Sequence, residues 1–114
     1  MKTEKMFFMT CHLAGRQYHD ADEVWNKLKV GTLLQLEHDS ANHFDPNAVA
    51  VLYKKVDEKE PYCIGYIPRS ENKVLSTFIQ MGWNDMFECR ISMLNPVAHP
   101  EAQVRLTIKI KKNM

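Results

Sequence analysis

The sequence predicts a mainly β (α+β) fold, a small and partly open antiparallel β-barrel of about six strands with one clear helix and one short helix. Six segments have the length and apolar content of strands, and several of them alternate apolar and polar residues with a period of two. Only residues 70–81 keep the apolar spacing of a helix over two turns. Many short strands with few helices favour a barrel over a parallel sheet covered by helices.

The first half of the chain begins with a strand at residues 7–14, where apolar side chains alternate with others. Asp20 and Glu23 make an Asp-x-x-Glu capping pair at the start of the short helix. Leu34 and Leu36 then point inward from a second strand, whose other positions are polar.

The second half contains four more strands and the clear helix. Residues 48–53 are apolar on both faces, as in a central strand, and residues 62–67 follow after a charged turn. Gly65 inside that strand indicates a bulge or the close approach of another backbone. Ser70 and Glu71 begin the helix and Gly82 caps its end. The helix places four apolar residues on one side: Val74, Leu75, Phe78 and Ile79.

The two final strands come from the segments 87–93 and 104–111, which both alternate apolar and polar residues. A loop that contains Pro96 and Pro100 connects them. They complete the set of six strands.

Length and charge limit the possible functions. A chain of 114 residues is long enough for one core, so we expect one domain over residues 1–114. The composition is 45% hydrophobic and 25% charged, which is ordinary for a soluble globular protein. The net charge of +1 excludes a basic coat over the whole surface, so any affinity for nucleic acid must come from a local patch.

Cysteine usage predicts a reducing compartment. Cys11, Cys63 and Cys89 are odd in number and widely spaced, so no disulfide framework is expected. Cys11 and Cys89 fall on the apolar phase of strands, as buried thiols do. No stretch has transmembrane length and the N-terminal apolar run is too short for a signal peptide, so we expect a cytoplasmic protein.

Motifs for catalysis, metals and cofactors are missing from the sequence. There is no phosphate-binding loop, no Cys-x-x-Cys, no His-x-x-x-His and no Gly-x-Ser-x-Gly, so we expect neither an enzyme nor a bound cofactor, and no metal site. Asp39 and Asp45 resemble an acid and base pair. Turn capping is the favoured interpretation, because isolated acidic pairs are common in loops.

Residues 39–47 form the most distinctive stretch, a polar loop around one aromatic residue. Asn42 and Asp45 bond readily to nearby backbone, and Pro46 fixes its own φ, so the loop is expected to be rigid. Phe44 either folds inward to fill the barrel mouth or stays exposed and stacks on a base. Composition alone favours the inward orientation, and the sequence does not decide between the two.

Two arginines flank this loop in the predicted arrangement. Arg16 ends the first strand and Arg69 begins the clear helix. One interpretation is solvated surface charge. The other is that both contact phosphates, with Arg69 helped by the helix N-terminus beside it.

Three segments in order resemble the signatures of the HIRAN domain family: Gly15-Arg16-Gln17-Tyr18, then Asn42-His43-Phe44-Asp45-Pro46-Asn47-Ala48-Val49-Ala50-Val51, then Ile64-Gly65-Tyr66-Ile67-Pro68-Arg69. The resemblance covers about residues 7–110 and implies an OB-like β-barrel. Members occur beside SNF2-type helicase and RING modules in DNA-repair proteins, and alone in bacteria and phages. The resemblance therefore implies a stand-alone module that binds single-stranded DNA at 3′-hydroxyl ends.

The resemblance also implies roles for individual residues. Asp45 would accept a hydrogen bond from the terminal 3′ hydroxyl, Phe44 would stack on the terminal base, and Pro46 with Asn47 would shape the loop. The remaining nucleic-acid-binding set is Arg16, Tyr18, Asn42, Tyr66 and Arg69. Where end-binding members have two tyrosines after the Arg, this chain has Gln17-Tyr18. His38-Asp39-Ser40 replaces the usual Arg-Glu-Pro, and His43 stands where Pro is common.

The leading hypothesis is thus a non-enzymatic nucleic-acid-binding module that acts in DNA repair or processing, as a monomer or weak oligomer. A helicase or nuclease encoded separately is its expected partner. The alternative is a protein-interaction module that keeps the barrel without the DNA-end site, and that pairs an exposed edge at residues 105–111 with a partner strand. A small nuclease-associated or metal-dependent domain is a third hypothesis.

Overall fold

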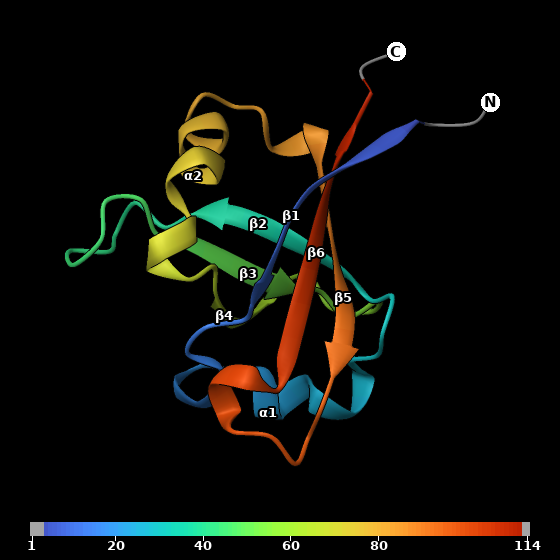
Figure 1. Cartoon of the computed structure of the whole chain (residues 1–114). Helices are drawn as coiled ribbons and strands as arrows, with labels where there is room; N and C mark the ends of the chain where they lie inside the picture. The colour runs from blue at the N-terminus through green and yellow to red at the C-terminus, as the bar shows by residue number, and fades with distance from the viewer. Residues whose placement is uncertain (1–3, 113–114) are drawn as a thin grey trace.

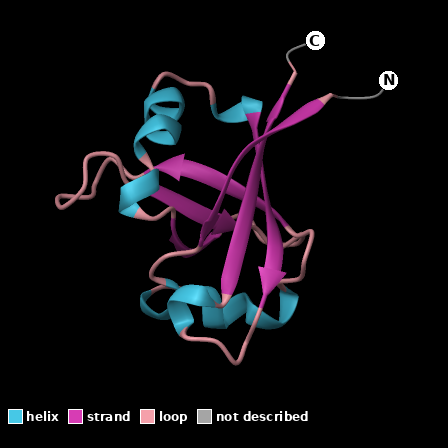
Figure 2. Cartoon of the chain, in the orientation of Figure 1, coloured by secondary structure: helices cyan, strands magenta, loops and turns pink. Residues whose placement is uncertain are grey.

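The computed structural model describes residues 4–112 and contains a six-stranded antiparallel sheet (Figures 1 and 2). The strand order is β1-β6-β5-β2-β3-β4. The strands are β1 (Lys5–His12), β2 (Leu33–His38), β3 (Val49–Tyr53), β4 (Tyr62–Tyr66), β5 (Phe87–Leu94) and β6 (Val104–Lys111). The predicted number of strands and the mainly β class are therefore confirmed.

The sheet coils strongly but does not close into a complete barrel. β1 and β4 are the outer strands of the order and do not pair along their lengths within the described residues. One bridge beyond the end of β1 joins the two sides, where Ala14 and Tyr66 exchange backbone hydrogen bonds of 2.8 and 2.9 Å. Gly65 allows this contact, because a Cβ there would lie 2.6 Å from the carbonyl oxygen of Ala14. The predicted close approach at Gly65 is confirmed.

The core lies between the two halves of the coiled sheet. In Figure 1, β1, β6 and β5 cross in front of β2 and β3, and the two helices lie at opposite ends. Apolar residues from all six strands and both α-helices meet in one cluster. Cys11 and Cys89 belong to it, with exposures of 2% and 1%, as the alternation of their strands predicted.

The short helix is α1 (Ala21–Val24), which a 3-10 turn at Trp25–Lys27 extends. The predicted capping pair is wrong. The Asp20 side chain makes no capping hydrogen bond, and the Glu23 backbone N–H donates to the Asp20 carbonyl at 3.1 Å. In so short a helix the Glu23 N–H is satisfied by the Asp20 carbonyl of the turn, and it needs no side-chain cap.

The clear helix is α2 (Lys73–Gln80), and it begins three residues later than predicted because residues 69–71 form a 3-10 turn. Leu75 and Ile79 are buried, whereas Val74 and Phe78 are 54% and 40% exposed. The helix therefore packs a narrower side on the core than predicted. Gly82 has a φ of 90° just beyond the C-cap, which agrees with its predicted role.

β6 is an interior strand, which corrects the expectation of an exposed edge at residues 105–111. It pairs with β1 along one side and with β5 along the other. Its backbone groups are occupied by these neighbours, so it has no free edge for a partner strand. Within residues 4–112, no helix has the length and apolar character needed to cross a membrane.

Candidate functional site

The loop between β2 and β3 projects from the body of the protein beside the 3-10 turn that precedes α2 (Figures 1 and 2). Three side chains spaced three residues apart hold it. Asp39 Oδ1 accepts from the Ala41 N–H, and Asn42 Oδ1 accepts from the N–H groups of Phe44 and Asp45. Asp45 Oδ1 in turn accepts from the Asn47 N–H at 2.9 Å. These are successive Asx turns, in which each side chain replaces a backbone partner.

The base of the loop is closed by contacts across it. The Asp39 N–H donates to the Ala48 carbonyl at 2.9 Å, just beyond the β2–β3 ladder. A ring nitrogen of His38 lies 2.8 Å from the Pro46 carbonyl oxygen. The loop thus satisfies much of its own backbone, and the predicted capping roles of Asp39 and Asp45 are confirmed.

Phe44 lies outside the core. The residue is 86% exposed. Its backbone N–H donates a hydrogen bond to Asn42 Oδ1. The exposed ring leaves apolar surface in water, and the ordered backbone limits the entropy lost on binding to that of the side chain. The outward orientation corrects the inward one that composition alone favoured, and the ring is available for stacking.

Asp45 is tied to α2 as well as to its own loop. Its Oδ2 accepts from the Asn72 side chain at 2.8 Å. The Asn47 N–H, then the Asn72 amide and the charge of Arg69, hold the pKa of Asp45 below its usual range against partial burial. Asp45 is therefore a carboxylate at neutral pH. An ionised carboxylate has about four acceptor positions, so two hydrogen bonds leave room for a donor from a ligand.

Tyr66 joins the loop to the end of β4. Its hydroxyl donates to Asp39 Oδ2 at 2.6 Å, and the ring of His19 lies 5.0 Å from its ring, centroid to centroid. Burial and the bond to the Asp39 carboxylate raise the pKa of Tyr66, so it stays protonated as a donor. Tyr66 thus fixes the loop base to the sheet.

Arg16 is 8% exposed and faces the short helix. Its Nη2 lies 2.6 Å from Asp22 Oδ1, and its Cζ lies 4.1 Å from the ring centroid of Trp25. Its Nε is buried without a hydrogen-bond partner among the described residues. Tyr18, two residues later, is 76% exposed. Arg16 is thus largely buried and paired with Asp22, whereas Tyr18 is an exposed aromatic.

The three sequence segments meet in space. Ala14 and His19, which flank the first segment, contact Tyr66 of the third. Tyr66 and Asn72, which lies three residues beyond the third segment, bond to the loop. Sequence reasoning missed Asn72, which is 2% exposed. A polar residue at the start of an apolar helix was the available signal.

Asn42 and Arg69 complete the predicted set. Asn42 shapes the loop from within through its Oδ1. Arg69 is exposed, and its charge contributes to the lowered pKa of Asp45. Across residues 4–112, no three His, Cys, Asp or Glu side chains are placed to hold a metal ion.

Comparisons with known proteins bear on the family and the fold. The family model described as HIRAN domain matches residues 6–112. Among solved structures, the chain is similar to the crystal structure of a structural-genomics target protein from Lactobacillus plantarum, with a TM-score of 0.76. The two sequences are 20% identical, and the match covers 98% of this chain and 100% of the other. That likeness shows the fold. No curated protein matches the chain.

Proposed function

Because the chain belongs to the HIRAN domain family, a family of nucleic-acid-binding domains, we propose that it binds single-stranded DNA at ends that carry a 3′ hydroxyl. The observation that supports this proposal is the pairing of an exposed ring with an adjacent carboxylate on one rigid loop. Phe44 is 86% exposed, and Asp45 beside it is held in its charged form. In this proposal the domain binds and performs no chemical step.

The proposed recognition needs both residues. Phe44 stacks on the terminal base, an interaction worth about 1–3 kcal/mol for each base. Asp45 accepts the hydrogen bond of the terminal hydroxyl. An internal 3′ oxygen is esterified and has no proton to donate, so a carboxylate acceptor selects for a free end. Tyr18, the exposed aromatic of the first segment, is the proposed contact on the other side of the base.

Phosphate contacts are assigned to the two arginines. Arg69 is exposed next to Asp45 and can approach the last phosphate directly. Arg16 already pairs with the exposed Asp22 carboxylate, so a phosphate would have to displace Asp22 from its guanidinium group. Asn42 and Tyr66 line the site by holding the loop in shape.

The proposed setting is DNA repair or processing in the cytoplasm, where the three free thiols stay reduced. The chain acts as one domain, as a monomer or weak oligomer. It delivers DNA ends to a helicase or nuclease on a separate chain.

Fluorescence anisotropy with short single strands tests the proposal. Two strands of one sequence, ending in a 3′ hydroxyl or a 3′ phosphate, are titrated with protein at two salt concentrations. We expect tighter binding to the hydroxyl end, and loss of that preference in Asp45→Ala. Asp57→Ala, in the exposed turn between β3 and β4, is the matched control and should keep it.

Equal affinity for both ends in the wild-type protein would refute end recognition. So would an Asp45→Ala variant with an unchanged preference. Absence of binding to either strand would instead favour the protein-interaction alternative.

A further inference from the structure

The outer face of β1, β6 and β5 carries a cluster of positive charge away from the β2–β3 loop. Core residues alternate with outward ones along β6, where Val104, Leu106 and Ile108 are fully buried. Cross-strand pairs bring the outward positions of the three strands together. We call this surface the basic face. It is defined by its charged members: Lys5, Glu88, Arg90, Arg105, Lys109 and Lys111.

Charge is distributed unevenly between this face and the rest of the protein. The basic face holds five of the fifteen Lys and Arg residues and one of the fourteen Asp and Glu residues. The remainder of the chain therefore has ten basic residues against thirteen acidic ones. The net charge of +1 is therefore compatible with one predominantly positive face. A polyanion is attracted by the local potential of such a face rather than by the net charge of the protein.

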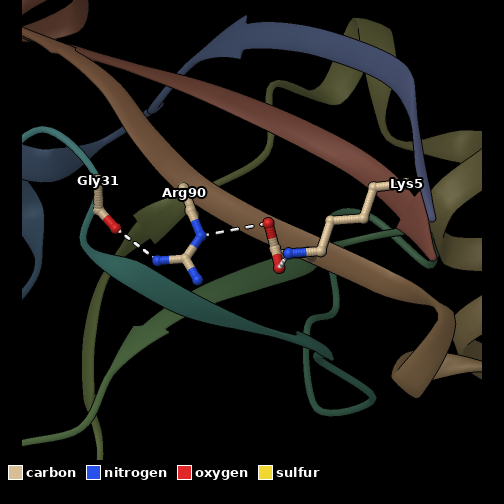
Figure 3. A network of polar contacts seen from close by, with 4 residues as sticks. Lys5, Gly31 and Arg90 are labelled. Atoms are coloured by element: carbon tan, nitrogen blue, oxygen red, sulfur yellow. Dashed lines mark hydrogen bonds and ion pairs between the residues drawn. The ribbon is translucent and has the colours of Figure 1, made fainter. Parts of the chain in front are cut away.

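The single carboxylate on the basic face neutralises only two of its cations (Figure 3). Glu88 lies 2.6 Å from Lys5 Nζ and 3.2 Å from Arg90 Nε, and these contacts, Lys5 first, hold the pKa of Glu88 below its usual range. Arg90 also donates through Nη1 to the Gly31 carbonyl at 2.7 Å. These contacts fix Arg90 in one orientation on the outer surface.

The other three cations lie along β6 and have no carboxylate within ion-pair distance among residues 4–112: Arg105, Lys109 and Lys111. Lys111 is directly opposite Lys5 in the ladder. Like charges directly opposite each other destabilise a sheet. Glu88 offsets the charge of Lys5, so the uncompensated charge lies on Arg105, Lys109 and Lys111, and an anion bound over these three would offset it.

We propose that the basic face binds the phosphodiester backbone of a polynucleotide, independently of any chain end. Three cations on one strand, Arg105 to Lys111, span six residue steps, or about 20 Å at the rise of a β-strand. A track of that length accommodates several nucleotides, in line with the roughly 4–16 nucleotides that one OB fold covers. Thr107, between the cations, adds a hydroxyl donor for phosphate oxygens.

Two neighbouring features favour a nucleic acid and set the path of its backbone. Phe7 is 61% exposed and pairs with Lys109 across the ladder, which places an aromatic ring beside a cation, as in single-strand binding surfaces. On the other side, an open groove of about 530 Å³ between β2 and β5 is lined by Glu37 and Asp85, and by Glu88 and Lys111 of the basic face itself. Three carboxylates against one lysine make this groove unfavourable for phosphates, so the backbone would follow β6 and β1.

A circular single-stranded DNA tests the proposal, because it has phosphates and bases but no ends. Anisotropy of a labelled circle is measured from 50 to 200 mM salt with the wild-type protein and the triple variant Arg105→Gln/Lys109→Gln/Lys111→Gln. We expect the wild-type protein to bind the circle. The affinity of the variant for the circle should be lower by about tenfold or more. The slope of log affinity against log salt should become shallower by about 0.7 for each lost contact, or about 2 in total.

The matched control removes the same charge elsewhere, with Lys27→Gln/Lys54→Gln/Lys59→Gln at exposed positions. It should bind the circle as the wild-type protein does. Thermal melting should show that the basic-face variant is at least as stable as the wild-type protein, since it removes a like-charge pair.

Three results would overturn the proposal: no binding of the circle by the wild-type protein, equal losses in both triple variants, or a basic-face variant that loses binding to anionic lipid vesicles and not to DNA. Failure of end recognition is a separate result. It would appear as equal affinity for linear strands with 3′ hydroxyl and 3′ phosphate ends, and it would leave binding of the circle unchanged.

Discussion

Gly65 allows the contact that joins the two sides of the open sheet, and its replacement by alanine tests that contact directly. An added Cβ would lie 2.6 Å from the Ala14 carbonyl oxygen and 2.8 Å from two side-chain atoms of Leu13. Ordinary contacts begin at 3.4 Å, so the two segments must separate by about 0.8 Å. Leu13 is fully buried and has no space to move into. The strain therefore acts on the Ala14–Tyr66 bridge.

The expected cost of Gly65→Ala follows from these contacts. Overpacking a well-packed site costs about 1–3 kcal/mol. Weakening the two backbone hydrogen bonds between Ala14 and Tyr66 adds about 1 kcal/mol if they are not remade. We expect the free energy of unfolding to fall by about 2–4 kcal/mol, and Tm to fall by roughly 10 °C.

Urea unfolding, followed by the fluorescence of Trp25 and Trp83, measures this change. Gly31→Ala and Gly82→Ala are the controls. An added Cβ meets nothing within 4 Å at either position, although both have positive φ angles, of 96° and 90°. Left-handed backbone alone should cost them about 1–2 kcal/mol. If Gly65→Ala proved no less stable than these controls, crowding at the bridge would not be the cause and the reasoning would fail.

Three further predictions concern exposed and buried groups. Phe44→Ala should weaken binding of a short single strand about tenfold, as anisotropy would show, and leave Tm unchanged because the ring is exposed; a lower Tm would contradict this. The depressed pKa of Asp45 means that its loop-stabilising contribution is present above the ordinary value of 3.8 and is lost as the pH falls through the lower folded-state pKa. An NMR titration midpoint at or above 3.8 would refute it. Burial raises the pKa of Cys11 to about 12 and also raises that of Cys89, so neither thiol should react with an alkylating reagent at pH 8 before denaturant is added.

Strand positions were predictable because alternation is a local property. Val104, Leu106 and Ile108 are buried in β6 as the period of two requires. The neighbours of a strand are not a local property, which is why residues 105–111 were expected at an edge and lie between β1 and β5. In α2 the pattern identified the helix, but it placed Val74 and Phe78 with the buried pair. The apolar pattern of a helix does not show how many of its apolar side chains the sheet covers.

The loop was predictable in its chemistry and less so in its attachments. Asp, Asn and Pro in one short stretch predicted turns held by side chains, and Asp39, Asn42 and Asp45 make these turns. The tie from Asn72 to Asp45 and the pairing of Arg16 with Asp22 depend on how separate elements pack. Motif spacing alone does not show that Asp22 pairs with Arg16, the arginine that is also expected to contact a ligand.

Net charge was a poor guide to the surface for the same physical reason. The total of +1 argued against a basic coat, and that argument is correct for the whole molecule. The alternation in β6 already placed Arg105, Lys109 and Lys111 on one face. Only the ladder shows that Lys5 lies opposite Lys111 and that Glu88 lies opposite Lys109. Screened charges act over about 10 Å at moderate salt, which is the width of two or three strands. For a small β domain, the pairing order of the strands therefore decides what a polyanion meets, and the sum of charges along the chain does not.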